Sequence, residues 1–324
     1  MRHCWPSSSD MQGSFLHSNM SHFETLMYAT YYAPRGRPRL YMLGSLLAGR
    51  YLGPTDLLIG IIGGEGSGKS TLIKGLFPGL ELTNDDDGVN LRSTPIYDFQ
   101  PENFFAPHTF HIDVRYELAF KQPFEIIEAV NRAIENGRRV VIEHFDLLYK
   151  QLGYNAQIIF AIGEELVVCR PTVFGPFPAE IKSHAEKTAI FRRMAHTAED
   201  ITSYILAADY NYTRRVLHSD VKHGFVIKFS DKPDINIHDV EEKVLQVIKA
   251  DVPVGIACKD KISIGDWQMY CTGTRTHVKS SGQIENFRLW QDYVYDPIWK
   301  EFMLVGMVGP KKGVGAEGIT YFSE

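Results

Sequence analysis

A glycine-rich octapeptide, GGEGSGKS at residues 63–70, constrains the fold of this chain more than any other segment. We call it the glycine loop. An apolar run, DLLIGII (56–62), precedes it, and a helix-like segment, STLIKGLF (70–77), follows it. The loop fits the pattern G-x-x-x-x-G-K-[ST], in which backbone N–H groups surround a phosphate and a helix N-terminus adds its dipole. The sequence therefore predicts a buried strand, a phosphate-binding loop and a helix in an α/β domain.

The same pattern predicts a role for each residue of the glycine loop. We expect Lys69 to reach the β- and γ-phosphates of a nucleotide and to act in phosphoryl transfer, and the Ser70 hydroxyl to ligate Mg²⁺. The nucleotide, ATP or GTP, would be bound by Gly63, Gly64, Gly66, Ser67, Gly68, Lys69, Ser70 and Thr71. The alternative is a glycine-rich turn that binds nothing, which the flanking strand and helix disfavour.

Nucleotide chemistry of this kind also needs a carboxylate at the end of a neighbouring strand, to orient Mg²⁺ or water. RVVIEHFD supplies Glu143 and Asp146, and the acidic turn NDDDG (84–88), after the strand-like LELT (80–83), supplies Asp85, Asp86 and Asp87. We predict a catalytic role for Glu143, because a carboxylate that closes an apolar strand is costly to bury unless it is paired or metal-bound. Asp86 is the second candidate, although a solvated acidic turn is the common alternative. The layout resembles the P-loop kinases of the uridine-kinase type, in which a carboxylate after the second strand activates a substrate hydroxyl.

Four segments make up the expected organisation. Residues 1–32 predict a loose tail, and residues 33–55 predict an extended basic arm, because prolines interrupt it, followed by a helix over 41–53. Residues 56–178 alternate strands and helices, which predicts a parallel sheet flanked by helices. The expected elements there are strands at 80–83, 108–114 and 138–146, two further strands in AQIIFAI and ELVVCR, and a helix at 124–137. FGPFP (174–178) predicts the boundary between two domains.

Residues 179–324 predict a second domain of α+β type. A long helix is expected over 184–208, a strand in KHGFVIKFS, and a helix over 239–250 opened by a capping box of Asp239 and Glu242. Short strands and turns follow to the end of the chain.

Composition excludes several classes of protein. A length of 324 residues favours two domains, and 44% hydrophobic with 23% charged residues is ordinary for a soluble protein. The net charge of −5 has the wrong sign for a protein held to nucleic acid mainly by bulk charge. Four cysteines make no disulfide framework, and no apolar run approaches the roughly 20 residues that span a bilayer. We therefore expect a cytoplasmic protein with no membrane partner, while the oligomeric state is not predicted.

The second half of the chain carries four side chains of types that bind zinc. His196 and Asp200 lie in RRMAHTAEDITSYIL (192–206), one helical turn apart and so on one face. Cys271 and His277 lie in IGDWQMYCTGTRTHVKSSGQIENF (264–287), in a segment rich in Gly and Thr. Two histidines, an aspartate and a cysteine are acceptable donors for Zn²⁺. The sequence therefore offers a zinc site made by a helix and a hairpin.

These segments resemble the second additional domain of alanyl- and threonyl-tRNA synthetases and of free-standing alanyl-tRNA editing proteins. That family carries H-T-A-x-H on a helix and, later, C-G-G-T-H-V followed by x-x-T-G-E-I-x-x-F. This chain reads HTAED at 196–200, Cys271 and THV at 276–278, and SGQIENF at 281–287, and the resemblance covers about residues 185–305. It departs at Asp200, which replaces a histidine, and in the five rather than three residues between Cys271 and His277.

The family's zinc site lies where the 3′ end of a mischarged tRNA is hydrolysed. The resemblance therefore implies that His196, Asp200, Cys271 and His277 bind zinc, and that tRNA or an aminoacyl group is a partner. The alternative is a degenerate domain in which these side chains only pack. Arginines at 35, 37, 39, 192–193 and 214–215 would be available to a tRNA backbone, although scattered arginines more often form a solvated face.

Three functions are consistent with these patterns. The first is an ATP- or GTP-dependent kinase or NTPase whose second domain selects a substrate. The second is a zinc-dependent aminoacyl-tRNA editing hydrolase with an accessory nucleotide domain. The third is a nucleotide-gated protein that holds tRNA or an aminoacyl group without cleaving it. The phosphate acceptor is not predicted.

Overall fold

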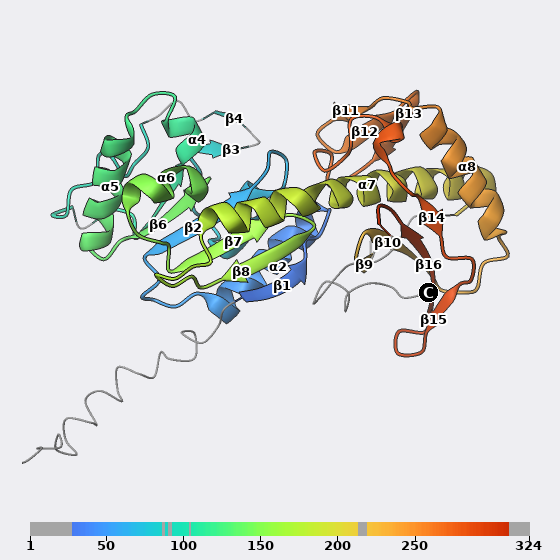
Figure 1. Ribbon diagram of the computed structural model, residues 1–324, viewed down its shortest axis with the longest axis horizontal. Coiled ribbons are helices and arrows are strands. Elements are labelled where there is room, and N and C mark those ends of the chain that lie inside the picture. Colours follow the sequence, from blue (N-terminus) through green and yellow to red (C-terminus); the bar gives the residue numbers. More distant parts are fainter. Residues whose placement is uncertain (1–27, 86–87, 90–92, 104, 213–218, 311–324) are drawn as a thin grey trace, which may run out of the picture.

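In the computed structural model, which describes residues 28–310 apart from 86–87, 90–92, 104 and 213–218, the chain forms two lobes that share one long helix (Figure 1). The first lobe contains a six-stranded sheet in the order β1-β8-β7-β2-β6-β5. Its strands are β1 (Tyr28–Tyr32), β2 (Leu58–Gly63), β5 (Thr109–Asp113), β6 (Arg139–Glu143), β7 (Ile158–Ile162) and β8 (Glu165–Cys169). Strands β5, β6, β2 and β7 are parallel, whereas β8 pairs antiparallel with both β7 and β1.

Helices cover both faces of this sheet, because its central strands are apolar on both sides. Leu58 and Ile62 of β2 join a core that includes α5 (Pro123–Glu135) and α6 (Phe145–Leu152). Ile59 and Ile61, which point to the opposite face, join a core with α2 (Arg37–Tyr51) and α3 (Lys69–Leu76). The short helix α4 (Val114–Glu117) follows β5, and a two-stranded hairpin is formed by β3 (Asn84–Asp85) and β4 (Gly88–Val89). This packing presents the carboxyl ends of β2, β5 and β6 at one edge.

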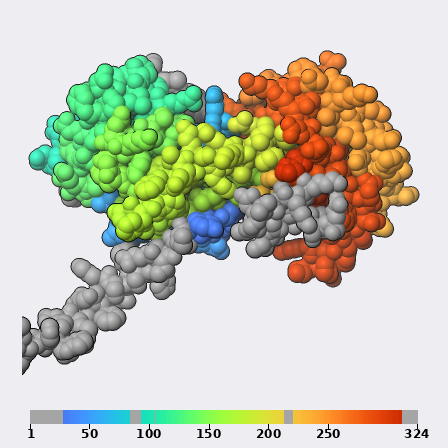
Figure 2. All heavy atoms as spheres, viewed as in Figure 1, coloured from blue at the N-terminus to red at the C-terminus, as the bar shows by residue number. Residues whose placement is uncertain are grey.

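The second lobe contains two antiparallel sheets beside the long helix α7 (Pro178–Tyr210). One sheet contains β9 (Ser219–Val221), β10 (Gly224–Phe229), β14 (Arg288–Leu289), β15 (Val294–Asp296) and β16 (Glu301–Met307). The other contains β11 (Val254–Cys258), β12 (Lys261–Ile264) and β13 (Trp267–Tyr270). Helix α8 (Ile237–Lys249) and a single 3₁₀ turn (Ser281–Gln283) complete the lobe. Figure 2 shows α7 crossing from one lobe to the other on the face in view.

Buried ion pairs join the two lobes. Lys222, in the turn between β9 and β10, is fully buried and its Nζ lies 2.7 Å from Glu165 Oε1 at the start of β8. The neighbouring His223 Nδ1 lies 2.7 Å from Glu164 Oε2. Burial acts to raise the pKa of Glu165, but hydrogen bonds from His184 and Lys222 outweigh it, so this pKa lies below its ordinary value of 4.5. The first lobe therefore presents two carboxylates to the Lys222 ammonium and the His223 imidazole of the second lobe in a buried interface.

Several sequence predictions for the first lobe need correction. The sheet is mixed rather than purely parallel, because β8 turns back directly after β7. Residues 28–32 form β1 rather than part of a tail, and the expected arm at 33–40 already enters α2 at Arg37. Pro38 is accepted there because the first turn of a helix leaves its N–H groups without intrahelical partners. The expected strand at 80–83 does not form, and that segment lies outside the six-stranded sheet.

Helix α7 packs against the cores of both lobes, so the predicted boundary at 174–178 does not coincide with the division between them. It begins at Pro178, close to the expected boundary, but Ile181 and Ala185 pack into the core of the first lobe. Packing against the second core begins at Ile190, so the division between the lobes falls inside the helix rather than before it.

Helix α8 is capped by Asn236, whose side chain accepts from the His238 N–H, and not by the expected capping box of Asp239 and Glu242.

We predict that Glu165→Ala will destabilise the protein by about 3 kcal/mol, because the buried Lys222 ammonium loses the carboxylate that lies 2.7 Å from it. The matched control is Asp209→Ala, which removes the partner of Lys243 in an exposed pair and should leave stability unchanged. Urea unfolding at neutral pH measures both. Since Glu165 has a lowered pKa, its contribution is present above pH 4.5 and is lost as the pH falls, so the effect of the substitution should shrink in acid. Equal stability of both variants at neutral pH would contradict this account.

Candidate functional site

The glycine loop connects β2 to α3 as the sequence predicts. Gly66 (φ 69°) and Gly68 (φ 96°) adopt left-handed backbone conformations that favour glycine. The Lys69 side chain is 6% exposed, and its ammonium donates to the Gly64 carbonyl at 3.0 Å. Ser70 and Thr71 lie in the first turn of α3. The loop therefore gathers backbone N–H groups, an ammonium and a hydroxyl at the start of one helix.

Two carboxylates lie at the carboxyl ends of the neighbouring strands. Glu143 ends β6 and Asp113 ends β5, and the two residues are register partners in the parallel pair. Glu143 Oε1 lies 3.5 Å from Lys69 Nζ, and both carboxylates are buried. One donor atom each from Asp113, Glu143 and His144 lies within 4.8 Å of the others. Carboxylate oxygens at this edge are suitable ligands for Mg²⁺.

The surroundings of Glu143 keep it ionised. Burial acts to raise its pKa, but His111 and the Lys69 ammonium outweigh burial and hold this pKa below its ordinary value. His111 Nδ1 accepts from the Thr83 N–H at 3.1 Å, so its Nε2 carries the proton and faces Glu143 Oε2 at 3.6 Å. Burial and the charge of Lys69 lower the pKa of His144, which is therefore uncharged at neutral pH. The edge thus presents an anionic carboxylate, with the Lys69 ammonium and the uncharged His144 imidazole beside it.

The other sequence candidates for this edge are Asp146 and the acidic turn at 84–88. Asp146 lies in α6 and pairs with Lys182 at 2.8 Å. Asp85 lies in β3, and Asp86 and Asp87 lie outside the described residues. Asp113 is the carboxylate that sequence reasoning missed. It follows the apolar run of β5 as Glu143 follows that of β6, so the same signal was available for it.

A second group of donors lies in the second lobe, where α7 meets the segment after β13. One donor atom each from His196, Asp200, Cys271 and His277 lies within 4.8 Å of the other three. His277 Nε2 lies 3.0 Å from Asp200 Oδ2, and Cys271 Sγ lies 3.5 Å from His196 Nε2 and 3.9 Å from His277 Nε2. The His196 Nε2 to Asp200 Oδ2 distance is 3.9 Å. We call this group the four-donor cluster.

Backbone groups orient the donors of the cluster. His196 Nδ1 faces the Thr276 carbonyl at 3.2 Å, and His277 Nδ1 faces the Thr274 carbonyl at 3.3 Å. Each imidazole therefore presents its Nε2 to the centre of the cluster, as histidines do when a carbonyl fixes the ring orientation of a metal ligand. The Gly273 N–H donates to Cys271 Sγ at 3.4 Å. Asp200 is fully buried, so its charge requires a cationic partner or a metal.

The distances in the cluster fit a tetrahedral zinc site. Zinc bonds of about 2.0–2.3 Å at tetrahedral angles separate neighbouring donors by about 3.3–3.8 Å. The four separations given above, 3.0 to 3.9 Å, lie within about 0.3 Å of this interval. The Asp200 substitution and the longer loop, which depart from the family pattern, are thus compatible with a four-donor arrangement.

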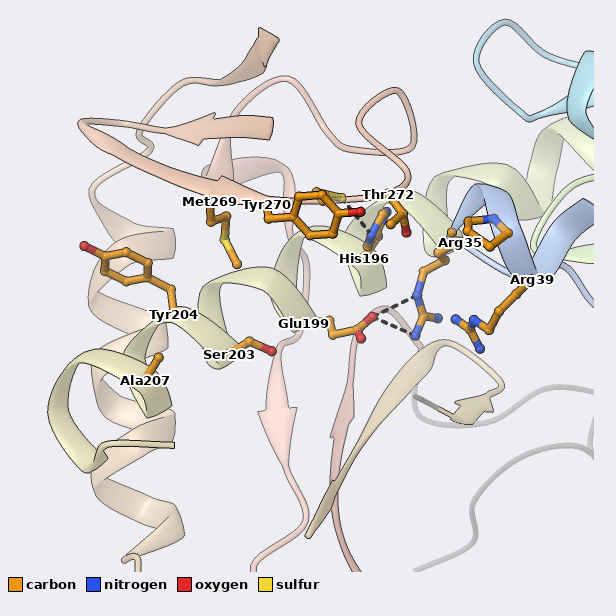
Figure 3. Close-up of a pocket in the computed structure, with 13 residues that line it drawn as sticks. Arg35, Arg39, His196, Glu199, Ser203, Tyr204, Ala207, Met269, Tyr270 and Thr272 are labelled. Carbon is orange, nitrogen blue, oxygen red and sulfur yellow. Dashed lines mark hydrogen bonds and ion pairs between the residues drawn. The ribbon is translucent and has the colours of Figure 1, made fainter. Parts of the chain in front are cut away.

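A cavity of about 370 Å³ opens beside the four-donor cluster (Figure 3). His196 and Cys271 form part of its wall, and Met269 and Tyr270 make another part apolar. Its remaining lining residues come from α7, from the start of α2 and from the segment after β13: Arg35, Gly36, Pro38, Arg39, Glu199, Ser203, Tyr204, Ala207 and Thr272. Because residues from both lobes line it, the cavity depends on how the lobes pack.

The arginines that the sequence offers to nucleic acid have other partners in the structure. Arg35 is 6% exposed and lies 2.9 Å from Glu199 and 2.8 Å from Asp220. Arg192 is also buried, and its Nη1 donates to the Ser67 carbonyl of the glycine loop at 2.8 Å. These two residues are therefore buried and are not part of a solvated face. The pair at 214–215 lies outside the described residues.

Comparisons with known proteins leave the assignment open. No protein-family model matches this chain, and a search of curated proteins found no significant match. Within the described part of the chain, no helix is long and apolar enough to cross a membrane. Function is therefore inferred from the residues of the two sites.

We predict that Gly66→Ala will destabilise the folded protein more than Gly79→Ala. Both positions have a left-handed φ, 69° and 87°, so both substitutions carry the same backbone strain of about 1 kcal/mol. A Cβ on Gly66 would also lie 2.8 Å from the Arg275 carbonyl, whereas a Cβ on Gly79 would contact nothing within 4 Å. The difference between the melting temperatures of the two variants therefore measures the cost of the contact with Arg275. Equal melting temperatures would contradict a tight fit of the glycine loop against residue 275.

Proposed function

We propose that this protein is a nucleoside triphosphate-binding enzyme that transfers the terminal phosphoryl group of ATP or GTP, with Mg²⁺, to water or to an acceptor hydroxyl. The observation that carries the proposal is the position of Lys69, between the Gly64 carbonyl and Glu143 at the carboxyl end of the adjacent strand. A glycine loop between a buried strand and a helix, with a cation facing a strand-end carboxylate, is the arrangement that nucleotide phosphates and magnesium require.

Each residue has a role in the proposed reaction. The glycine loop and Lys69 bind the phosphates and orient the terminal phosphorus. Ser70 and one of the two carboxylates, Glu143 or Asp113, would hold Mg²⁺, which supplies neutralisation of phosphate charge. The bond from the terminal phosphorus to the bridging oxygen breaks as a bond to the acceptor oxygen forms. The nucleoside diphosphate leaves with the bridging electron pair, and the other of the two carboxylates accepts the acceptor's proton.

A second candidate function concerns the four-donor cluster and its cavity. We propose that His196, Asp200, Cys271 and His277 bind Zn²⁺, on the basis of their donor types and separations. A metal beside a partly apolar cavity suits a small acyl group, and Ser203 Oγ, which has no hydrogen-bond partner among the described residues, lines that cavity. This supports the alternatives of an aminoacyl-tRNA editing hydrolase or of a protein that holds an aminoacyl group or tRNA under nucleotide control.

We predict that Lys69→Ala will lower phosphate release from ATP or GTP by at least about 100-fold, because it removes the charge nearest the transferred phosphoryl group. Glu143→Gln should retain nucleotide binding and lose turnover, since the amide accepts no proton and neutralises less metal charge. The control is Lys187→Ala, an exposed cation on α7. Phosphate release and nucleotide titration calorimetry measure the two effects. Full activity of Lys69→Ala would contradict phosphoryl transfer at this loop.

We predict one zinc ion per chain, and its loss in both Cys271→Ser and His277→Ala. Elemental analysis of the purified protein measures this directly. Cys258→Ser is the matched control, because Cys258 is an exposed cysteine on β11, outside the cluster, and should leave the zinc content unchanged. A chelator should lower the melting temperature of the parent protein and of the control but not that of the two depleted variants. Metal-free parent protein after growth with zinc would contradict the site.

A further inference from the structure

The second lobe contributes cations to the edge of the glycine loop, which the sequence pattern of the loop does not include. Arg192 of α7 donates from Nη1 to the Ser67 carbonyl at 2.8 Å and from Nη2 to the Pro34 carbonyl at 2.5 Å. Its side chain is almost fully buried, so these two carbonyls hold the guanidinium in one position. Helix α7 is therefore fixed against the loop at this point.

The next residue along α7, Arg193, lies over the first half of the glycine loop. Its Nη2 is 3.6 Å from the position that a Cβ on Gly64 would occupy. The Gly64 carbonyl accepts the Lys69 ammonium, the group that reaches the β- and γ-phosphates in loops of this pattern. Arg193 therefore lies next to the residue whose carbonyl holds the Lys69 ammonium.

The segment after β13 also rests on the loop. The Arg275 carbonyl and Cβ lie 2.8 Å and 3.2 Å from the position of a Cβ on Gly66, so only glycine fits there without a shift. Arg275 itself is exposed. The second lobe thus covers the glycine loop from two segments, each of which carries arginine.

Positive charge is concentrated at this contact. Burial, together with the nearby charge of Arg35 and smaller contributions from Arg193 and Arg39, lowers the pKa of Arg192 to about 9. Asp220 offsets part of this repulsion. Glu199 also pairs with Arg35 at 2.9 Å, so the charge that faces the glycine loop is that of Arg192 and Arg193. Two guanidinium groups at a glycine loop favour a polyanion, such as a triphosphate, as the ligand.

We infer that Arg193 is a catalytic residue of the phosphoryl transfer proposed above: its guanidinium contacts the terminal phosphate of a bound triphosphate and stabilises the charge that develops as the bridging bond breaks. The inference rests on the proposed nucleotide function and adds a residue to it. Arg193 neither gains nor loses a proton in this role. Arg192 is a positioning residue, because it holds α7 against the Ser67 carbonyl without reaching the phosphate. An arginine supplied in this way within one chain accelerates related phosphoryl transfers by orders of magnitude.

The test compares triphosphate with diphosphate on the full chain. Titration calorimetry with ATP, ADP, GTP and GDP in the presence of Mg²⁺ gives affinities, and phosphate release gives turnover, for the parent protein, Arg193→Ala and Arg193→Lys. Arg132→Ala, a half-exposed arginine on α5 paired with Glu128, is the matched control. Lys69→Ala tests whether turnover depends on the glycine loop.

We expect Arg193→Ala to lower turnover by about 100-fold and to weaken triphosphate binding, while diphosphate affinity stays within about 2-fold of the parent. Unchanged diphosphate affinity also shows that the variant is folded, and Arg193→Lys should recover triphosphate affinity more than turnover. Parent-like turnover of Arg193→Ala in a protein that loses activity with Lys69→Ala would overturn the role of Arg193 alone. A parent protein that binds none of the four nucleotides would overturn the proposed function and this inference together.

Discussion

The hydrogen bond from Arg192 to the Ser67 carbonyl ties the long helix α7 to the glycine loop, and the arrangement of both candidate sites depends on that contact. One helical turn further along α7, His196 enters the four-donor cluster, and Asp200 follows after another turn. A rotation or a slide of α7 would therefore displace the cluster and the arginines at the loop together. Because Arg192 is buried and held by two carbonyls, such a movement would leave an unpaired guanidinium in the interior.

The interface between the lobes is polar as well as tightly packed. A buried ion pair between Lys222 and Glu165 and a hydrogen bond between His223 and Glu164 join the two lobes. Buried pairs contribute little net stability compared with apolar packing, but breaking one leaves an uncompensated charge. These buried contacts favour one relative orientation of the lobes. In that orientation, residues of both lobes line the cavity beside the four-donor cluster.

The sequence alone supported correct predictions for the glycine loop and the elements beside it, where the information is local. The glycine loop, its strand and its helix form as expected, because glycine conformations and apolar runs act over a few residues. The four donors come together as the resemblance implies. The carboxylate edge was only half predicted: Glu143 lies beside Lys69, but its neighbour is Asp113. That choice depends on which strand pairs with β6, and strand order is a tertiary property.

Residue types and short spacings are enough to specify the glycine-loop pattern, the four donor residues of the cluster and the amphipathic periods of the main helices. Only the tertiary structure decided that β8 runs antiparallel, that α7 belongs to both lobes, and that Arg192 and Arg193 lie at the glycine loop rather than on a solvated face. The physical reason is distance along the chain. Arg192 and Ser67 are 125 residues apart, and no local propensity or charge pattern specifies a contact that only the packing of two lobes creates.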